Sequence, residues 1–399
     1  MRAWRLEPEV EPAAVGVDPA VLERMCGALE EAAGRLFRGA QLALYRRGRR
    51  VLDAGIGIAR ERTAVEVAPD TLFVLFSATK GLTALALLRL HERGALHWDE
   101  PVIKYWPEFA RLVPQKASVT IRHVLSHRGG FPLGPGWLTT RHFGDREALR
   151  RAMEEVPLRY GPGERAAYHP LNFGHVLGEL VLRVDGRDCG RLLREEVFEP
   201  LGLRDLHLGL PADPALEARM AWCYNDLDAL PTGANPPARA ADPAARAARL
   251  RERFGDTPEL AHGFNRPETW RAVLPAAGAI GCARDLARVY AVLARGGAEG
   301  PVVLATREGL AAATTPVSRA SERDATLGLV VRWGTGFHMG MYGRGSTLRT
   351  FGHAGMGGQV AFADPDRELA FAFLTNGELS DDFLLWRYRL QSLAFSACG

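Results

Sequence analysis

The 399-residue chain has no long apolar segment, and this absence argues against a membrane-spanning protein. Its longest uncharged apolar runs, such as residues 81–88, fall far short of the roughly 20 residues that a transmembrane helix needs. The first 18 residues also contain no apolar stretch of the length typical of a signal peptide. We therefore expect no membrane partner and a cytoplasmic location.

The chain also lacks the residue patterns that bind metals or form disulfide frameworks. Its five cysteines are odd in number and widely scattered, and no two form a C-x-x-C pair. No two histidines have the H-E-x-x-H spacing. These absences predict reduced thiols, no metal and no cofactor. The cysteines are Cys26, Cys189, Cys223, Cys282 and Cys398.

An excess of charge of one sign is missing too. The formal net charge is +3, and no dense basic stripe is interleaved with aromatic residues, so we expect no nucleic-acid partner. The apolar fraction of 47% and the charged fraction of 24% are ordinary for a globular protein. The length allows two or three domains, or one large α/β catalytic unit.

Lysine is scarce, and this scarcity draws attention to one segment. Lysine accounts for three of the 50 Lys and Arg residues, and the chain has nine serines. Residues 73–90, FVLFSATKGLTALALLRL, begin as a strand-like apolar run and continue as a helix, with Ser77 and Lys80 near its start. Residues three apart share one face of a helix, and the helix N-terminus favours developing negative charge.

Ser77 and Lys80 are a candidate reaction centre for acyl transfer. Serine needs a base beside it to act as a nucleophile. A lysine within a strongly apolar stretch is costly unless it has partners. The alternative is a purely structural role, with a helix-capping serine followed by a surface lysine.

The two ends of the chain predict the sheet. Residues 18–36 have helical apolar spacing after the N-cap candidate Asp18. Residues 41–57 and 357–377 each read as a β-hairpin, and a helix over about 381–396 follows. Strands at both termini with helices between them predict an α/β fold whose antiparallel sheet is built from both ends. We expect an α/β domain formed by residues 1–80 and 275–399, with a mostly helical domain, 81–274, inserted.

One stretch of the inserted region has a different composition. Residues 230–260 are rich in Pro, Ala and Arg and poor in large apolar residues. They are interpreted as a solvated insertion, or alternatively as a lid or substrate-selecting wall, because long loops in enzymes often border the site.

Two later stretches carry further candidate residues. Tyr168 follows a Pro-Gly turn and precedes an apolar helix, which can bring its phenol into a cleft. A tyrosine that simply packs in the core is the alternative. His353-Ala354-Gly355 leads into a strand after several glycines, which let backbone approach a ligand closely.

Together, Ser77-Ala78-Thr79-Lys80, Tyr168 and His353-Ala354-Gly355, in this order, resemble the serine β-lactamase and penicillin-binding superfamily. Within it the chain is most similar to class C β-lactamase-like proteins and family VIII carboxylesterases. The resemblance implies a β-lactamase-like fold, Ser77 as the acyl-forming nucleophile, and Lys80 and Tyr168 as the groups that move its proton. A paired ammonium and tyrosinate would favour each other and titrate as a unit. The implied oxyanion hole is made by the backbone N–H groups of Ser77 and Met356.

The chain departs from the superfamily pattern at two places that contact substrate. Where Tyr-x-Asn is usual, Tyr168 is followed by His169 and Pro170, and Asn172 lies two residues too far on. Where Lys-Thr-Gly is usual, His353 replaces the lysine. The substrate-binding residues implied by the resemblance are therefore His353, Gly355 and Asn172, with Arg344 or Arg349 as possible replacements for the missing cation.

These departures favour a serine hydrolase that cleaves short-chain carboxylic esters through an acyl-enzyme. A D-alanyl peptidase or β-lactamase, and an acyltransferase to a small alcohol or amine, are the alternatives. A non-catalytic binding protein is disfavoured because Ser77, Lys80 and Tyr168 are all present. The absence of a G-x-S-x-G elbow argues against an α/β-hydrolase mechanism. We expect a small-molecule ester as partner and leave the oligomeric state open.

Overall fold

The computed structural model describes residues 2–224, 263–377 and 382–399. The Pro/Ala/Arg-rich stretch at 230–260 lies outside the described residues. No described helix is both long enough and apolar enough to cross a membrane.

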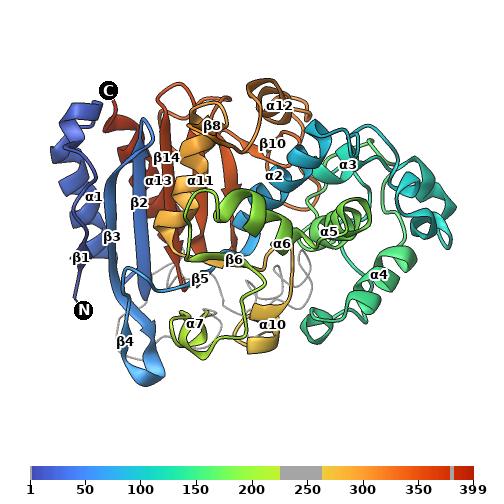
Figure 1. Ribbon diagram of the computed structural model, residues 1–399, viewed down its shortest axis with the longest axis horizontal. Coiled ribbons are helices and arrows are strands. Elements are labelled where there is room, and N and C mark those ends of the chain that lie inside the picture. Colours follow the sequence, from blue (N-terminus) through green and yellow to red (C-terminus); the bar gives the residue numbers. More distant parts are fainter. Residues whose placement is uncertain (1, 225–262, 378–381) are drawn as a thin grey trace.

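A large antiparallel sheet joins the two ends of the chain (Figure 1), as the sequence predicts. The second strand of the chain pairs with the last one along its whole length, from Ala40 opposite Thr375 to Arg46 opposite Leu369. In sheet order the strands are β1 (Trp4–Arg5), β3 (Arg49–Arg60), β2 (Gly39–Arg46), β14 (Leu369–Thr375), β13 (Val360–Asp364), β12 (Phe351–Ala354), β11 (His338–Met339) and β10 (Arg332–Trp333), and β4 (Val65–Glu66) pairs with β3.

Both expected hairpins are present, and local chemistry explains their turns. The β2–β3 turn contains Arg47 and Gly48, both with positive φ (51° and 75°), as tight hairpin turns require. At the β13–β14 turn, the Asp364 carboxylate accepts hydrogen bonds from the Asp366 and Arg367 amides at 2.9 and 3.2 Å. Short strands β10 to β12 were not expected, because two to four residues carry little periodic signal.

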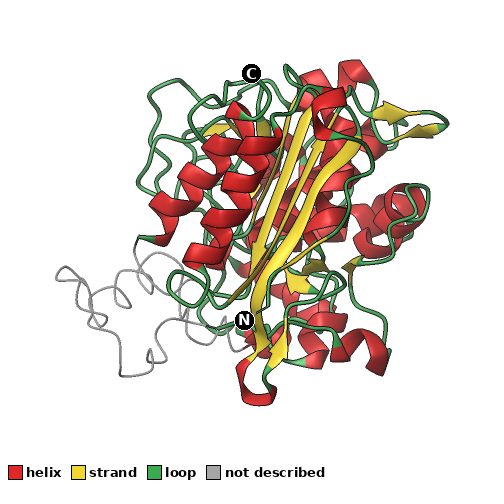
Figure 2. Cartoon of the chain, turned by 90° about the vertical axis from the view of Figure 1, so that its left-hand side faces the viewer, coloured by secondary structure: helices red, strands yellow, loops and turns green. Residues whose placement is uncertain are grey.

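Helices cover both faces of the sheet. α1 (Pro19–Ala32) and α13 (Phe383–Ser396) pack together on one face, where Figure 2 shows two helices in front of the strands. α11 (Ala283–Ala294) packs on the other face against β2, β13 and β14. Asp18 caps α1 by accepting from the Ala20 amide, as predicted, but the helix ends four residues early because Ala33 is extended. The sheet is thus the middle layer of a sandwich.

Most of the remaining helices gather beyond α11, on the side of the molecule opposite α1 (Figure 1). One apolar core runs from the α11 face of the sheet through α2 into this helical part. The division at residues 80 and 275 therefore stays a prediction. The remaining helices are α2 (Thr79–Glu92), α3 (Ile121–Leu125), α4 (Arg146–Glu155), α5 (Asn172–Asp185), α6 (Cys189–Leu193), α7 (Pro214–Ala218), α10 (Pro267–Arg271) and α12 (Arg307–Ala313). Strands β5 (Phe73–Val74), β7 (Ala279–Gly281) and β6 (Leu206–Leu208) form a small sheet in that order. Strands β8 (Ala298–Glu299) and β9 (Val302–Val303) form another.

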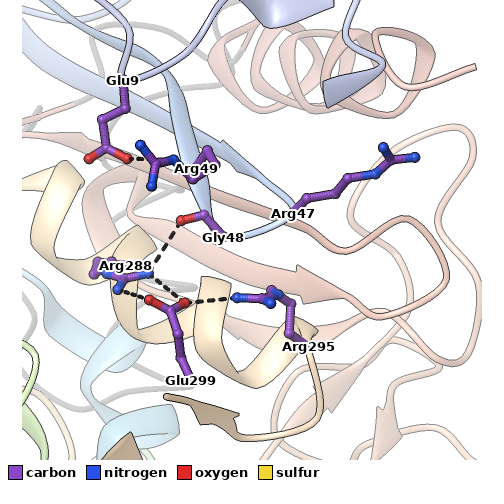
Figure 3. Close-up of a pocket in the computed structure, with 7 residues that line it drawn as sticks. All are labelled: Glu9, Arg47, Gly48, Arg49, Arg288, Arg295 and Glu299. Atoms are coloured by element: carbon purple, nitrogen blue, oxygen red, sulfur yellow. Dashed lines mark hydrogen bonds and ion pairs between the residues drawn. The ribbon is translucent and has the colours of Figure 1, made fainter. Parts of the chain in front are cut away.

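A pocket of about 570 Å³ lies where the β2–β3 turn meets the C-terminal end of α11 (Figure 3). One carboxylate oxygen of Glu299, Oε2, accepts hydrogen bonds from Arg288 and from Arg295, both at 3.0 Å. Arg288 also donates to the Gly48 carbonyl oxygen at 3.3 Å. These contacts join the hairpin turn, α11 and β8 through one carboxylate. The residues that line the pocket therefore have a structural role, which is to hold these three elements together.

Candidate active site

Ser77 lies in the connection between strand β5 and helix α2. The preceding residue, Phe76, has a positive φ of 44°, a conformation that costs a non-glycine residue roughly 1–3 kcal/mol. The Phe76 ring is buried against Phe264, with ring centroids 4.9 Å apart, and this packing holds the strained residue in place. A single 3-10 turn, Phe76–Ala78, then leads into α2. The serine therefore lies at the N-terminal end of a buried helix, as the sequence predicts.

Lys80 reaches Ser77 from the first turn of α2. Its Nζ lies 3.0 Å from Ser77 Oγ, 2.8 Å from the Pro170 carbonyl oxygen and 2.9 Å from the Ala276 carbonyl oxygen. The side chain is fully buried, and burial lowers its pKa well below the usual value for lysine. A neutral amine has two N–H groups, which the two carbonyl oxygens accept. Its lone pair is then free to accept the proton of Ser77 Oγ.

Tyr168 approaches Ser77 from a different part of the chain. Its hydroxyl lies 2.6 Å from Ser77 Oγ, and its ring stacks on Trp333 with an interplanar angle of 9°. Burial raises the pKa of Tyr168, the hydrogen bond to Ser77 opposes this, and the charge of Asp324 adds to the rise. Burial thus favours a neutral phenol beside a neutral amine. The expected mutual stabilisation of tyrosinate and ammonium stays a prediction, and burial of both groups acts against it.

The end of strand β12 lies against the other side of Ser77. A Cβ atom at Gly355 would lie 2.6 Å from the Leu75 carbonyl oxygen and 3.1 Å from the Ser77 nitrogen, so only glycine allows this approach. Met356 follows directly and begins a short turn, Met356–Gly358. The backbone of β12 is therefore close to the Ser77 amide. The oxyanion-hole role of Ser77 and Met356 stays a prediction that this proximity supports.

His353, at the position of the usual lysine, is a buried neutral group. Its Nδ1 lies 2.6 Å from the Ala354 carbonyl oxygen, and its ring packs near those of Tyr168 and Trp333. Burial is the largest cause that lowers the pKa of His353 well below its ordinary value. The third motif thus supplies an imidazole without a charge.

The comparisons with known proteins agree with this geometry. A family model described as beta-lactamase matches residues 28–394. The chain belongs to the beta-lactamase family. Esterase/beta-lactamase LipL of Mycobacterium tuberculosis is similar, with 33% identity over 359 residues that make up 87% of this chain and 79% of LipL.

Two crystal structures show that the beta-lactamase-like fold extends over the chain. A penicillin-binding protein homologue from Caulobacter crescentus superposes with a TM-score of 0.79 and 33% identity, covering 96% of this chain and 99% of that chain. A family VIII carboxylesterase also superposes with a TM-score of 0.79, at 26% identity, covering 99% of this chain and 100% of that chain. The chain is thus an enzyme, a serine hydrolase of the beta-lactamase family.

Asn172, the asparagine displaced from the usual family motif, is held by a neighbouring loop. It begins α5, is buried, and donates from its side-chain nitrogen to the Phe131 carbonyl oxygen at 2.8 Å. In the described part of the chain no hydrogen bond joins its side chain to Ser77, Lys80 or Tyr168. Its role in substrate binding stays a prediction without a contact to support it. The motif position itself is filled by Pro170, whose carbonyl oxygen accepts from Lys80 Nζ at 2.8 Å.

The two arginines considered as substitutes for the missing cation lie elsewhere. Arg349 forms an ion pair with Asp366 at 2.7 Å. Arg349 precedes the first residue of β12, whereas Gly355 follows its last residue. The Arg344 amide is bound to Ser392 of α13 at 2.8 Å. The suggestion that either arginine anchors a substrate carboxylate stays a prediction, and the ion pair of Arg349 with Asp366 gives it no support.

Two residues that matter for the site carry no sequence signal. Trp333 stacks on Tyr168, and Asp324 bonds to the Tyr168 amide at 2.9 Å, although 156 residues separate Asp324 from Tyr168. No motif spacing connects positions so far apart. Outside the site, the described side chains of Asp205, Cys282 and Asp285 come close enough together to hold a metal ion. Arg219 and Arg284 already form ion pairs with the two carboxylates of this group.

Proposed function

We propose that this enzyme cleaves short-chain carboxylic esters through a covalent acyl-enzyme on Ser77. The observation that supports this most directly is the position of Ser77 Oγ, 3.0 Å from Lys80 Nζ and 2.6 Å from the Tyr168 hydroxyl. A serine with a base on one side and a proton donor on the other has the parts that acyl transfer needs. The esterase and carboxylesterase names of its relatives support an ester substrate.

Acylation begins with the neutral amine. Lys80 takes the proton of Ser77 as Oγ attacks the ester carbonyl carbon. The carbonyl oxygen becomes an oxyanion, which the Ser77 and Met356 amides stabilise. When the bond to the alcohol oxygen breaks, Tyr168 gives its proton to that oxygen, and the Lys80 ammonium returns a proton to the phenolate. The alcohol leaves, and acyl-serine and the neutral pair remain.

Deacylation runs the same steps in reverse with water in place of the alcohol. Water gives its proton to the Lys80–Tyr168 pair and its oxygen to the acyl carbon. The pair then returns a proton to Ser77 Oγ, and the carboxylic acid is released. A small alcohol in place of water would give acyl transfer, so the acyltransferase alternative uses the same groups.

The surroundings of His353 support uncharged substrates over β-lactams. A β-lactam carries a carboxylate, and holding it beside a neutral, buried imidazole costs several kcal/mol without a cation. Arg349 already pairs with Asp366, and Asn172 already donates its amide to Phe131. A short-chain ester needs none of these contacts.

A comparison of substrates tests the proposal. We expect kcat/KM for p-nitrophenyl butyrate to exceed that for nitrocefin or any penicillin by at least about 10³-fold, which is about 4 kcal/mol of transition-state binding. A D-Ala-D-Ala peptide should not be cleaved measurably. A fluorophosphonate should add once, at Ser77, and the Ser77→Ala control should take no label. Comparable rates for nitrocefin and the ester would contradict ester preference and favour a β-lactamase.

The cytoplasmic location expected from the sequence stays a prediction.

A further inference from the structure

Asp324 is a buried carboxylate that four N–H groups surround. It is 1% exposed and lies in the loop between α12 and β10. One oxygen accepts from the amides of Tyr168, Thr326 and Leu327 at 2.9 Å each. The other accepts from Trp333 Nε1 at 3.0 Å. In the described ranges no arginine, lysine or histidine forms an ion pair with it, so these donors alone compensate its charge.

The carboxylate fixes Tyr168 at two points. It holds the tyrosine backbone through the amide, and it holds the indole of Trp333, on which the phenol ring stacks at a centroid distance of 5.6 Å. A shift of Asp324 would therefore move both the backbone and the ring platform of Tyr168. Catalytic steps lose about 10²-fold for misplacements near 1 Å.

We propose that Asp324 is a positioning residue that keeps Tyr168 directed at Ser77 Oγ as the proton donor to the leaving group. The proposal rests on the proposed ester cleavage and adds a division of labour to it. Lys80 removes the proton of Ser77, and Tyr168 supplies the proton that the departing alcohol needs.

The charges around Tyr168 support this division. Burial lowers the pKa of each nearby basic group and so favours its neutral form: Lys80 on α2, His127 and His169 on the loops beside Tyr168, His353 on β12, and His338 beside Trp333. Among the described residues, Asp324 is the one whose charge acts to raise the pKa of the Tyr168 phenol. A negative charge there opposes tyrosinate and raises the pKa of Tyr168, in addition to burial.

Glu322 provides a matched control. It accepts from the Ala166 amide at 2.8 Å and pairs with Arg128 at 2.8 Å, so it holds the same chain segment two residues before Tyr168. It bonds neither the Tyr168 amide nor Trp333. Glu322→Gln should loosen the segment while leaving the Asp324 carboxylate and its contacts with Tyr168 and Trp333 in place.

The experiment compares two leaving groups. p-Nitrophenolate departs without a proton, whereas ethoxide requires one, so the ratio of kcat/KM for ethyl butyrate to that for p-nitrophenyl butyrate reports on the proton donor. We expect Asp324→Asn to lower this ratio at least about 10-fold, Tyr168→Phe to lower it further, and Glu322→Gln to leave it within about twofold of wild type.

A folded Asp324→Asn enzyme with the wild-type ratio, or an equal fall in Glu322→Gln, would overturn the positioning role while ester cleavage by the wild type stood. If Asp324→Asn does not fold, Trp333→Phe decides in the same way, because it removes one donor to the carboxylate and keeps a stacked ring. A wild-type enzyme that cleaves neither ester would overturn the proposed function, and this inference with it.

Discussion

Two of the three lysines in this chain are fully buried, and they serve different purposes. Lys80 contacts Ser77. Lys116 donates to the Met153 and Glu154 carbonyl oxygens at 2.7 and 3.0 Å, at the C-terminal end of α4. A rare residue type therefore marked positions with specific partners, but only the neighbouring serine distinguished the catalytic candidate from the structural lysine.

The shared proton of Lys80 and Tyr168 gives a prediction at this scale. Lys80→Ala and Tyr168→Phe should each lower kcat/KM for ethyl butyrate, whose leaving group needs a proton, by at least about 10²-fold, since positioned acid–base groups contribute that much. Both side chains act on the same Ser77 oxygen, so the double variant should be little worse than either single one. Steady-state kinetics of the three variants measure this. Losses that multiply fully would show that the two groups act independently.

Lys116 gives a prediction of stability against pH. Burial lowers its pKa from the usual 10.5 to about 8. Between these values the unfolded chain binds a proton that the folded protein does not, so the free energy of unfolding contributed by Lys116 rises with pH. Urea unfolding of wild type and Lys116→Met should show a difference that moves in favour of wild type from pH 8 to pH 10. A difference independent of pH in this window would mean that Lys116 keeps its ordinary pKa.

At the scale of elements, the site forms where the β5–α2 connection meets the end of β12. The first contributes a strained Phe76 that orients Ser77, and the second contributes a glycine that lets the two backbones touch. Neither element alone forms an oxyanion hole. The distance between them decides whether two amides can point at one oxygen.

Gly355→Ala tests this contact. The new Cβ would meet the Leu75 carbonyl oxygen at 2.6 Å and must push β12 away from Ser77, so kcat/KM should fall at least about 10²-fold. Gly27→Ala in α1 is the control, because nothing lies within 4 Å of its Cβ and alanine favours a helix by up to about 1 kcal/mol. Kinetics and thermal melts of both variants measure this. Full activity in Gly355→Ala would place the oxyanion hole elsewhere.

At the scale of the whole molecule, one apolar core connects the sheet with the helical part. It includes Ala43 and Ala370 of the sheet, Leu85 of α2 and Phe173 of α5. The β2–β14 pairing then closes the sheet between strands more than 300 residues apart in the chain. Among the described residues, separating the helical part from the sheet would expose members of this core.

We therefore predict a single cooperative unfolding transition, even though the sequence suggests an α/β domain and an inserted domain. Differential scanning calorimetry should give a calorimetric enthalpy close to the van't Hoff enthalpy. A fluorophosphonate bound at Ser77 should shift the whole transition. Two separable transitions would instead support independent domains divided near residues 80 and 275.

The sequence by itself determined what short-range geometry controls. The Ser77–Lys80 contact follows from residues three apart at the start of a helix, and the two hairpins follow from alternating apolar residues around turn residues. The motif order added Tyr168 and Gly355 through the family resemblance. In the structure the Tyr168 hydroxyl and the Gly355 backbone both lie close to Ser77.

The tertiary structure alone decided which distant groups complete the site. The carbonyl oxygens of Pro170 and Ala276 hold Lys80, and the carboxylate of Asp324 holds Tyr168, across separations of 90 to 196 residues. Packing also turned Asn172 toward Phe131 and made His353 neutral by burying it. Spacing along a chain specifies neighbours within a turn or a hairpin, whereas burial and long-range hydrogen bonds depend on how all the layers pack together.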